Sequence, residues 1–325
     1  MDRQGNSFQI LASGSSGNAT VLQHGETNVL LDMGISLTRT RKALSELGLG
    51  IEDLDGVVIT HEHSDHIKGL EMLVKYHPEV VLYASKGTQA KVPRGARVKT
   101  IERGRSFEIG SLSCHPYATQ HDANEPLGFR FEGEDGARLG WATDLGYWDD
   151  ETAEHLEDCH VVMIEANHDP DMLWKGPYPS FLKRRVSSRL GHLSNVQAMW
   201  LLDRIASPSL QRVILGHLSE KNNDTHLALR TVSKALSNAN IPISVAERKS
   251  AGPELAWEPG EFSHSGHTER VKDEDATEQL QATHNPPTPP KARDVTTDQT
   301  LNRPEQPNAK PSPAYSKRKS HPSML

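Results

Sequence analysis

The sequence predicts an α/β fold in which two β-sheets pack face to face and helices cover their outer sides. Near the N-terminus, short β-rich runs follow one another with Gly and polar turns between them, which is typical of paired antiparallel strands. Farther along the chain, apolar strand-like runs alternate with helical segments, which is typical of strands joined by helices.

The first elements set this pattern. The β-rich runs at residues 8–11, 19–23 and 28–31 predict a strand followed by a hairpin, because Gly, Ser and the turn 24–26 separate them. Leucines near helical spacing predict a surface helix over residues 37–47. Further strands are predicted at residues 56–59, 80–83, 98–101, 106–115, 129–132, 138–142, 161–164 and 213–215, and further helices at 67–76, 152–156, 198–205 and 227–236.

Turn and cap residues support several of these elements. The loop Gly133-Glu134-Asp135-Gly136 predicts a hairpin between the strands on either side of it. Ser194 and Gln197 have the spacing of a capping box before the helix at 198–205. Asp224 is placed to cap the last helix.

Composition narrows the class of protein. The net charge of −7 excludes the overall basic field of a general nucleic-acid binder, so any such contact requires a local patch. The two cysteines do not make a disulfide framework and are expected to be small core residues. We expect a cytoplasmic protein that does not span a membrane, because neither a signal-peptide pattern nor a long apolar segment is present.

The composition changes after about residue 258. Prolines cluster between residues 286 and 313, and large apolar residues become isolated. Such a segment buries too little apolar surface to offset its ordering entropy. We therefore predict a folded domain over residues 1–258 and a disordered, Pro-rich tail over residues 259–325.

The strand predicted at 56–59 runs into a candidate metal motif, Thr60-His61-Glu62-His63-Ser64-Asp65-His66. Four possible ligands within six residues, at the end of a rigid strand, are what a metal centre requires. Alternation along an extended chain would point His61, His63 and Asp65 to one side and leave Glu62 solvated. His66 would lie where the chain turns into a helix.

The motif His61-x-His63-x-Asp65-His66 resembles the signature of the metallo-β-lactamase-fold hydrolases. Several other stretches resemble the YycJ (WalJ or VicX) branch of that family. They are residues 11–18, 121–129, 142–146, 165–169, 191–195 and 215–219. The resemblance covers about residues 6 to 250 and not the tail. It implies an αββα sandwich of two mixed β-sheets, the metallo-β-lactamase fold.

The resemblance also implies a set of metal ligands. His61, His63 and His121 would bind one ion, and Asp65, His66 and His217 would bind the other. Asp144 would bridge the two. Taken alone, each of His121, Asp144 and His217 is equally compatible with an ordinary polar residue, but each follows a predicted strand, where loops carry functional groups. Five His and two Asp suit two divalent ions, either zinc or manganese, with iron as a further candidate.

The proposed chemistry needs a proton donor beside the ions. The resemblance to ribonuclease Z in two segments suggests that His192 donates this proton, held by Glu165, and Asp65 is counted among the catalytic groups. The alternative is that His192 only hydrogen-bonds the start of a helix. Two metal ions about 3.5–4 Å apart would activate water and stabilise the developing negative charge.

Candidate substrate contacts lie around the predicted site. The basic run Lys183-Arg184-Arg185 precedes His192 and is suited to phosphates. Ser15 and Asn18 lie in a Gly-rich turn whose donors could face a phosphate, although an ordinary tight turn is an equal alternative. His168 and Asn195 are expected near the pocket; for His168, a structural hydrogen-bonding role is an equal alternative.

The sequence thus favours a binuclear metal-dependent hydrolase that cleaves phosphodiesters. By resemblance it is a nuclease, a 5′→3′ exonuclease on double-stranded DNA, with DNA favoured over RNA as partner. One alternative is a small-molecule (cyclic) phosphodiesterase, or another ester or thioester hydrolase of this fold, since function belongs to the site. Another is a non-catalytic subunit that binds metal or nucleic acid.

Overall fold

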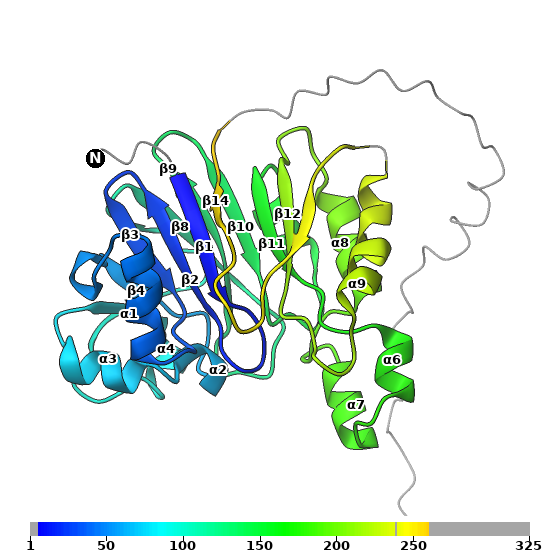
Figure 1. Cartoon of the computed structure of the whole chain (residues 1–325), viewed down its shortest axis with the longest axis horizontal. Coiled ribbons are helices and arrows are strands. Elements are labelled where there is room, and N and C mark those ends of the chain that lie inside the picture. The colour runs from blue at the N-terminus through cyan, green and yellow to red at the C-terminus, as the bar shows by residue number, and fades with distance from the viewer. Residues whose placement is uncertain (1–5, 238, 260–325) are drawn as a thin grey trace, which may run out of the picture. The chain divides into compact units, whose positions relative to one another are not determined.

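The computed structural model describes residues 6–237 and 239–259, all within one compact unit. Except for Pro259, the predicted tail lies outside the described residues, and the boundary at residue 258 stays a prediction. The described residues form two seven-stranded sheets with helices beside them (Figure 1). Among these residues, no helix is long and apolar enough to cross a membrane.

The two sheets are built on the same plan. The first has the order β14 (Glu254–Ala256), β1 (Asn6–Ala12), β2 (Ala19–His24), β3 (Thr27–Leu31), β4 (Gly56–Val58), β5 (Val81–Ser85) and β6 (Arg97–Ile101). The second has the order β13 (Ile243–Val245), β12 (Arg212–Gly216), β11 (Val161–Glu165), β10 (Arg138–Ala142), β9 (Leu127–Gly133), β8 (Leu112–Ala118) and β7 (Phe107–Ile109). In each sheet one end is antiparallel and the other is parallel, so both sheets are mixed.

Helices connect and flank the strands. They are α1 (Leu37–Glu46), α2 (Ser64–Ile67), α3 (Leu70–Tyr76), α4 (Lys86–Gln89), α5 (Asp150–Leu156), α6 (Pro170–Lys175), α7 (Ser180–Val186), α8 (Asn195–Ile205) and α9 (Thr225–Val232), with 3-10 turns η1 (Ile51–Asp53) and η2 (Ser233–Leu236). The capping box of Ser194 and Gln197 forms at α8, and the Asp224 carboxylate caps α9. Both match the sequence-based predictions.

Three buried layers hold this architecture together. Between the sheets, Phe8 and Leu22 of the first sheet pack with Phe129, Trp141 and Ile214 of the second. A second layer packs α1 and α3 against the outer face of the first sheet. A third packs α5, α8 and α9 against the outer face of the second sheet. These three layers confirm the αββα sandwich predicted from the sequence. In such a sandwich each sheet and each helix buries an apolar face against its neighbour.

Two predicted elements differ from those observed. The run at 106–115 is not one strand but the β7–β8 hairpin, in which Phe107 pairs with Cys114 and the chain turns at Gly110 with φ +55°. The helix predicted at 67–76 begins only at Leu70, and the one-turn helix α2 precedes it. Asp65 therefore lies on α2 and does not alternate with His61 and His63 along an extended strand.

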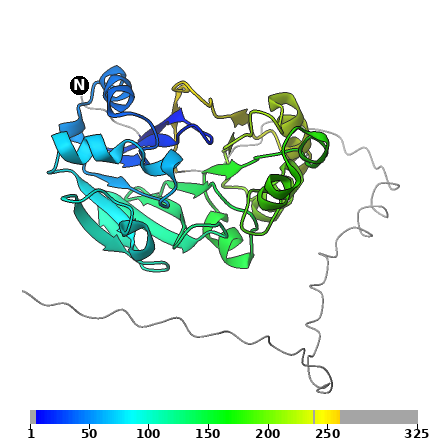
Figure 2. The same ribbon diagram turned by 90° about the horizontal axis from the view of Figure 1, so that it is seen from below.

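Strand direction brings distant parts of the chain to one edge. β3 and β4 are parallel, and so are β10, β11 and β12. β8 runs in the same direction as β10, because each is antiparallel to β9. The residues that follow the carboxyl ends of these strands therefore meet at one edge, as ligands commonly do in α/β sheets. Figure 2 views the molecule from below, the side on which α2 lies in Figure 1.

Candidate metal centre

The seven predicted ligands converge at this edge of the sandwich. Ligand atoms within 4.8 Å of one another form overlapping groups. The groups are His61, His63 and His121; Asp65, His66 and His217; His61, His66 and Asp144; and Asp144, Glu165, His192 and His217. Asp144 belongs to two of these groups and so lies between the ligands of the two predicted ions.

Hydrogen bonds fix the imidazole rings in one orientation. The Nδ1 atom of His66 donates to Asp32 Oδ2 at 2.7 Å, and that of His121 donates to the Gly191 carbonyl at 2.9 Å. His217 Nδ1 donates to Glu165 Oε1 at 2.7 Å. Each bond leaves the other ring nitrogen, Nε2, directed into the centre. Outer hydrogen bonds of this kind orient metal-binding histidines.

Thr60 organises the start of the motif. Its hydroxyl donates to Asp32 Oδ2 at 2.9 Å and therefore accepts from His61 Nδ1 at 3.0 Å. His63 differs from the other histidines, because it faces the centre through Nδ1, which lies 3.2 Å from His121 Nε2. Its Nε2 contacts the Asp122 carbonyl at 3.2 Å.

The residues present fit a pair of divalent ions. The Nε2 atoms of His61 and His217 are buried and have no hydrogen-bond partner among the described residues. A buried polar atom of this kind requires a partner, and imidazole nitrogens that converge with carboxylates form a donor set suited to zinc, manganese or iron. The centre is therefore built to hold cations, and the carboxylates of Asp65 and Asp144 would offset their charge.

The carboxylates at the centre stay ionised. Burial alone would raise the pKa of Asp144, but the charges of His217 and His66 hold it well below its ordinary value. Burial would also raise the pKa of Glu165, and the charges and hydrogen bonds of His192 and His217 lower it to about 2. Both groups thus carry a negative charge at neutral pH.

Glu165 links the predicted proton donor to the centre. Its Oε1 accepts from His192 Nδ1 at 2.8 Å and also from His217 Nδ1 at 2.7 Å. Its Oε2 accepts from the backbone N–H groups of Leu145 and Leu193 at 3.0 and 3.1 Å. The His192 side chain is 18% exposed. Because Nδ1 donates to Glu165, Nε2 is the ring atom of His192 that is able to exchange a proton with a substrate.

Three residues at the centre have left-handed backbone conformations. Asp32, Asp144 and His217 follow the ends of β3, β10 and β12 and have φ values of 58°, 55° and 53°. Residues other than glycine rarely adopt this region, and surrounding structure must hold them there. For His217, the Ser13 hydroxyl accepts its backbone N–H at 2.9 Å. The strain turns these side chains toward the centre.

The basic residues predicted to bind substrate lie on α7, beside the centre. Arg185 donates to Asp122 Oδ2 at 2.7 Å, and Asp122 directly follows His121. Lys183 donates to the Trp174 carbonyl at 2.8 Å. Arg184 is exposed. The three residues therefore lie on an element whose inner side contacts the centre.

The other predicted substrate residues are distributed differently. Ser15 is exposed in its turn, whereas the Asn18 amide is buried 3.0 Å from His66 Nε2, inside the centre. His168 is buried, and burial lowers its pKa to about 4. The structure does not bring Asn195 to the site, because it is fully buried and its amide pairs with Asn223.

Sequence reasoning missed three supporting residues and misplaced one. Thr60, Asp122 and Ser13 all contact predicted ligands, and the first two are sequence neighbours of ligands, which was the available signal. Glu62 was predicted to be solvated, but its carboxylate accepts the Asn124 N–H at 2.8 Å. It therefore ties the loop after His121 to the motif.

Comparisons with known proteins agree with this geometry. The β-lactamase superfamily domain profile matches residues 27–218. The chain is 34% identical over 253 residues to exodeoxyribonuclease WalJ of Streptococcus pneumoniae serotype 2, covering 75% of this chain and 93% of that protein. It is 32% identical over 245 residues to exodeoxyribonuclease YycJ of Bacillus anthracis, covering 74% and 92%.

A solved structure supports the fold independently. The metallo-β-lactamase fold protein YhfI from Bacillus subtilis matches with a TM-score of 0.60 and 13% identity, over 77% of this chain and 100% of that chain. Together with the matches in sequence, this confirms the predicted fold and family. The chain belongs to the β-lactamase superfamily of metal-dependent hydrolases and, within it, to the family of WalJ and YycJ.

Proposed function

We propose that this protein is an exodeoxyribonuclease that removes nucleotides from the 5′ ends of double-stranded DNA with the help of two divalent metal ions. The observation that carries the proposal is the His192–Glu165 pair beside the cluster of His and Asp side chains that could hold metal ions. The relatives named exodeoxyribonucleases, matched over most of their length, support DNA as the substrate.

The ligand assignment takes two of the four groups at the centre and adds Asp144, which belongs to the other two. His61, His63 and His121 would hold one ion, Asp65, His66 and His217 the other, and Asp144 both. When bound, the ions supply Lewis acidity, which stabilises charge on the phosphate and promotes the ionisation of water. Zinc and manganese both suit these ligands.

His192 is assigned to protonate the leaving group. Cleavage of a phosphodiester leaves an alkoxide oxygen, which requires a proton. His192 Nε2 gives up that proton, while the Glu165 carboxylate accepts from Nδ1 at 2.8 Å and fixes the orientation of the ring. The two N–H groups on the far oxygen of Glu165 keep that carboxylate in place. The ring then recovers a proton from solvent, to which it is partly exposed.

Digestion of end-labelled duplexes tests the proposal. The full chain, reconstituted with zinc or manganese, is incubated with DNA and RNA duplexes labelled at either the 5′ or the 3′ end. We expect a label at the 5′ end of DNA to be released as mononucleotides at once, and a label at the 3′ end to be released only at late times. Internal cuts, a 3′-first order or faster digestion of RNA would contradict the proposal.

A further inference from the structure

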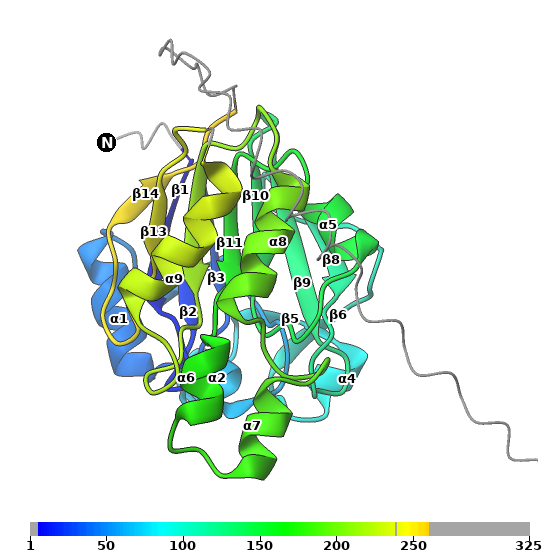
Figure 3. The ribbon, with the colours of Figure 1, turned by 90° about the vertical axis from the view of Figure 1, so that its right-hand side faces the viewer.

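The segment between β11 and α8 forms an arm, defined here as residues 170–190. It contains α6 and α7, and both helices project beyond the ends of the sheets (Figures 1 and 3). The chemistry proposed above uses no residue of the arm. The outward surface of the arm has no role in that chemistry.

The inner end of the arm is bonded to the metal centre. The Leu190 carbonyl accepts the backbone N–H of Asp122 at 3.1 Å, and the Val186 carbonyl accepts that of His192 at 2.9 Å. The Arg185–Asp122 ion pair adds a third link. A ligand on the arm would therefore lie next to the loops that carry His121 and His192.

The outer surface of the arm exposes large apolar side chains. Trp174 is 54% exposed and Phe181 is 68% exposed. With Leu190, they are three of the six large hydrophobic side chains that are exposed in the described part of the chain. Single exposed apolar residues are ordinary, but two aromatic rings and a leucine within 17 positions of one projecting segment indicate a contact surface.

The charge of this segment identifies its partner. Between Asp171 and Asp203 the sequence contains no acidic residue, although the chain as a whole has a net charge of −7. The same interval carries Lys175, Lys183, Arg184, Arg185 and Arg189. The Arg189 guanidinium stacks over the Tyr147 ring at 3.6 Å and so is held in position near the centre. Aromatic rings interleaved with basic groups suit a nucleic-acid strand.

We propose that the arm binds unpaired nucleotides, with Trp174 and Phe181 stacking on bases and Lys183 and Arg184 contacting phosphates. The proposal rests on the nuclease function proposed above and narrows its substrate. Base faces are free for stacking in a single strand and are covered in a blunt duplex. The arm therefore selects duplexes whose ends carry a single-stranded extension, and it places the end of that strand beside His192.

Binding to metal-free protein tests this directly. Fluorescence anisotropy compares a duplex with an unpaired extension and a blunt duplex of the same length, at the same salt concentration. Because base–aromatic stacking contributes substantially per base, Phe181→Leu and Trp174→Leu should each weaken binding of the extended duplex by about fivefold or more. Binding of the blunt duplex should change by less than about twofold, since it offers no base faces to stack on.

Matched variants separate stacking from general apolar contact. Phe181→Tyr keeps an aromatic ring and should bind the extended duplex like the wild type, whereas Phe181→Leu keeps the apolar character and should not. Trp200 is 48% exposed on α8, outside the arm, so Trp200→Leu should bind both duplexes normally. Circular dichroism of each variant verifies that the fold is retained.

Several outcomes would overturn the proposal. They are equal binding by Phe181→Leu and Phe181→Tyr, an equal loss on both duplexes, and self-association of the wild type that Phe181→Leu abolishes. The binding assay needs neither metal nor turnover. If the wild type digests DNA normally but binds the extended and blunt duplexes equally, only the proposed role of the arm is refuted. If it binds the extended duplex more tightly but does not digest DNA, the proposed nuclease function is refuted.

Discussion

The metal centre and the arm lie next to each other and are built in opposite ways. Each ligand at the centre is buried or half-buried, and partners such as Asp32, Thr60 and Glu165 fix the rings. On the arm, Trp174 and Phe181 are mostly exposed, and Arg184 is exposed beside them. This difference follows from what each region does. Reacting groups need fixed positions, whereas a surface that binds a flexible nucleic-acid strand needs accessible rings and charges.

The largest expected effect is at the centre of the buried cluster. Asp144→Asn removes the carboxylate that two ligand groups share, so we expect the protein to lose bound metal and turnover to fall roughly 10³-fold, which corresponds to about 4 kcal/mol. Metal analysis and DNA digestion measure the two losses. Asp203→Asn, on the exposed side of α8, is the control. Two bound ions and normal turnover in Asp144→Asn would refute the assignment.

The next effect separates proton transfer from metal binding. His192→Ala should lower kcat on DNA by roughly 10²-fold and leave the metal content unchanged, because His192 is assigned as acid and not as ligand. The loss should be much smaller for bis(p-nitrophenyl) phosphate, whose leaving group needs no proton. His226→Ala, at an exposed site on α9, is the control. Equal losses on both substrates would remove His192 as the proton donor.

The third prediction concerns His168, which is buried between the metal centre and the arm, just before α6. Its pKa is about 4 in the folded chain against an ordinary 6.5, so the folded state takes up this proton less readily than the unfolded chain. The free energy of unfolding of metal-free protein should therefore fall as the pH drops from 6.5 to 4, with up to about 3 kcal/mol due to His168.

Urea denaturation at pH 7 and at pH 4.5 measures this dependence. His168→Gln has no titrating ring at that position, so its stability should fall less over the same interval than that of the wild type. Other buried histidines contribute equally to both proteins and cancel in the difference. Parallel pH dependence of the two proteins would contradict the prediction.

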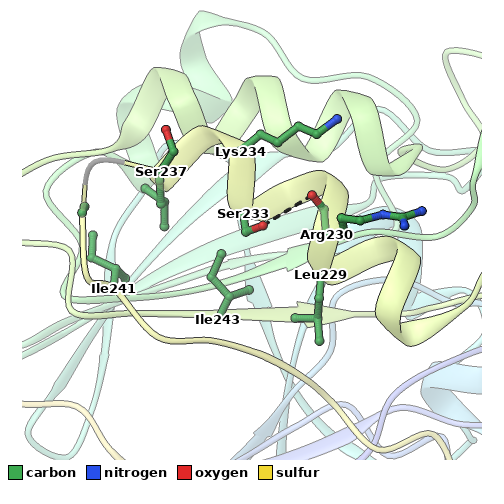
Figure 4. A pocket seen from close by; sticks show the side chains of 9 residues that line it. Leu229, Arg230, Ser233, Lys234, Ser237, Ile241 and Ile243 are labelled. Atoms are coloured by element: carbon green, nitrogen blue, oxygen red, sulfur yellow. Dashed lines mark hydrogen bonds between the residues drawn. The ribbon is translucent and has the colours of Figure 1, made fainter. Parts of the chain in front are cut away.

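The smallest effect tests the charge of the arm. Lys183→Ala with Arg184→Ala should weaken binding of extended and blunt duplexes alike, by about tenfold, and should reduce the slope of log affinity against log salt by about two. The control pair is Arg230→Ala with Lys234→Ala. Both control residues are exposed and line the hollow beside Ile243 (Figure 4).

The position of the control pair makes it a fair comparison. Ile243 pairs with Val213 at the start of β12, whereas His217 follows the end of that strand. The hollow therefore lies near the amino ends of these strands, whereas the metal centre lies at their carboxyl ends. Loss of the same salt response in both double variants would show that the arm has no special part in binding.

Local patterns were predicted best. The hairpin of β2 and β3, the capping box at α8 and the cap at Asp224 were predicted from residues within a few positions of each element. The β7–β8 turn at Gly110 was missed, because a single glycine within a β-rich run is not enough to predict a hairpin turn. The two short helices of the arm were also missed, since six or seven residues are too few for a clear helical period.

The sequence by itself determined the family, the order of the strands along the chain and the motif from His61 to His66, because these are encoded in neighbouring residues. Only the tertiary structure decided that His121, Asp144 and His217 reach that motif, since their convergence depends on which strands pair and in which direction. It also decided the ring orientations and the place of the arm. Those depend on contacts between residues far apart in the chain, such as the bond between Asp32 and His66 and that between Arg185 and Asp122.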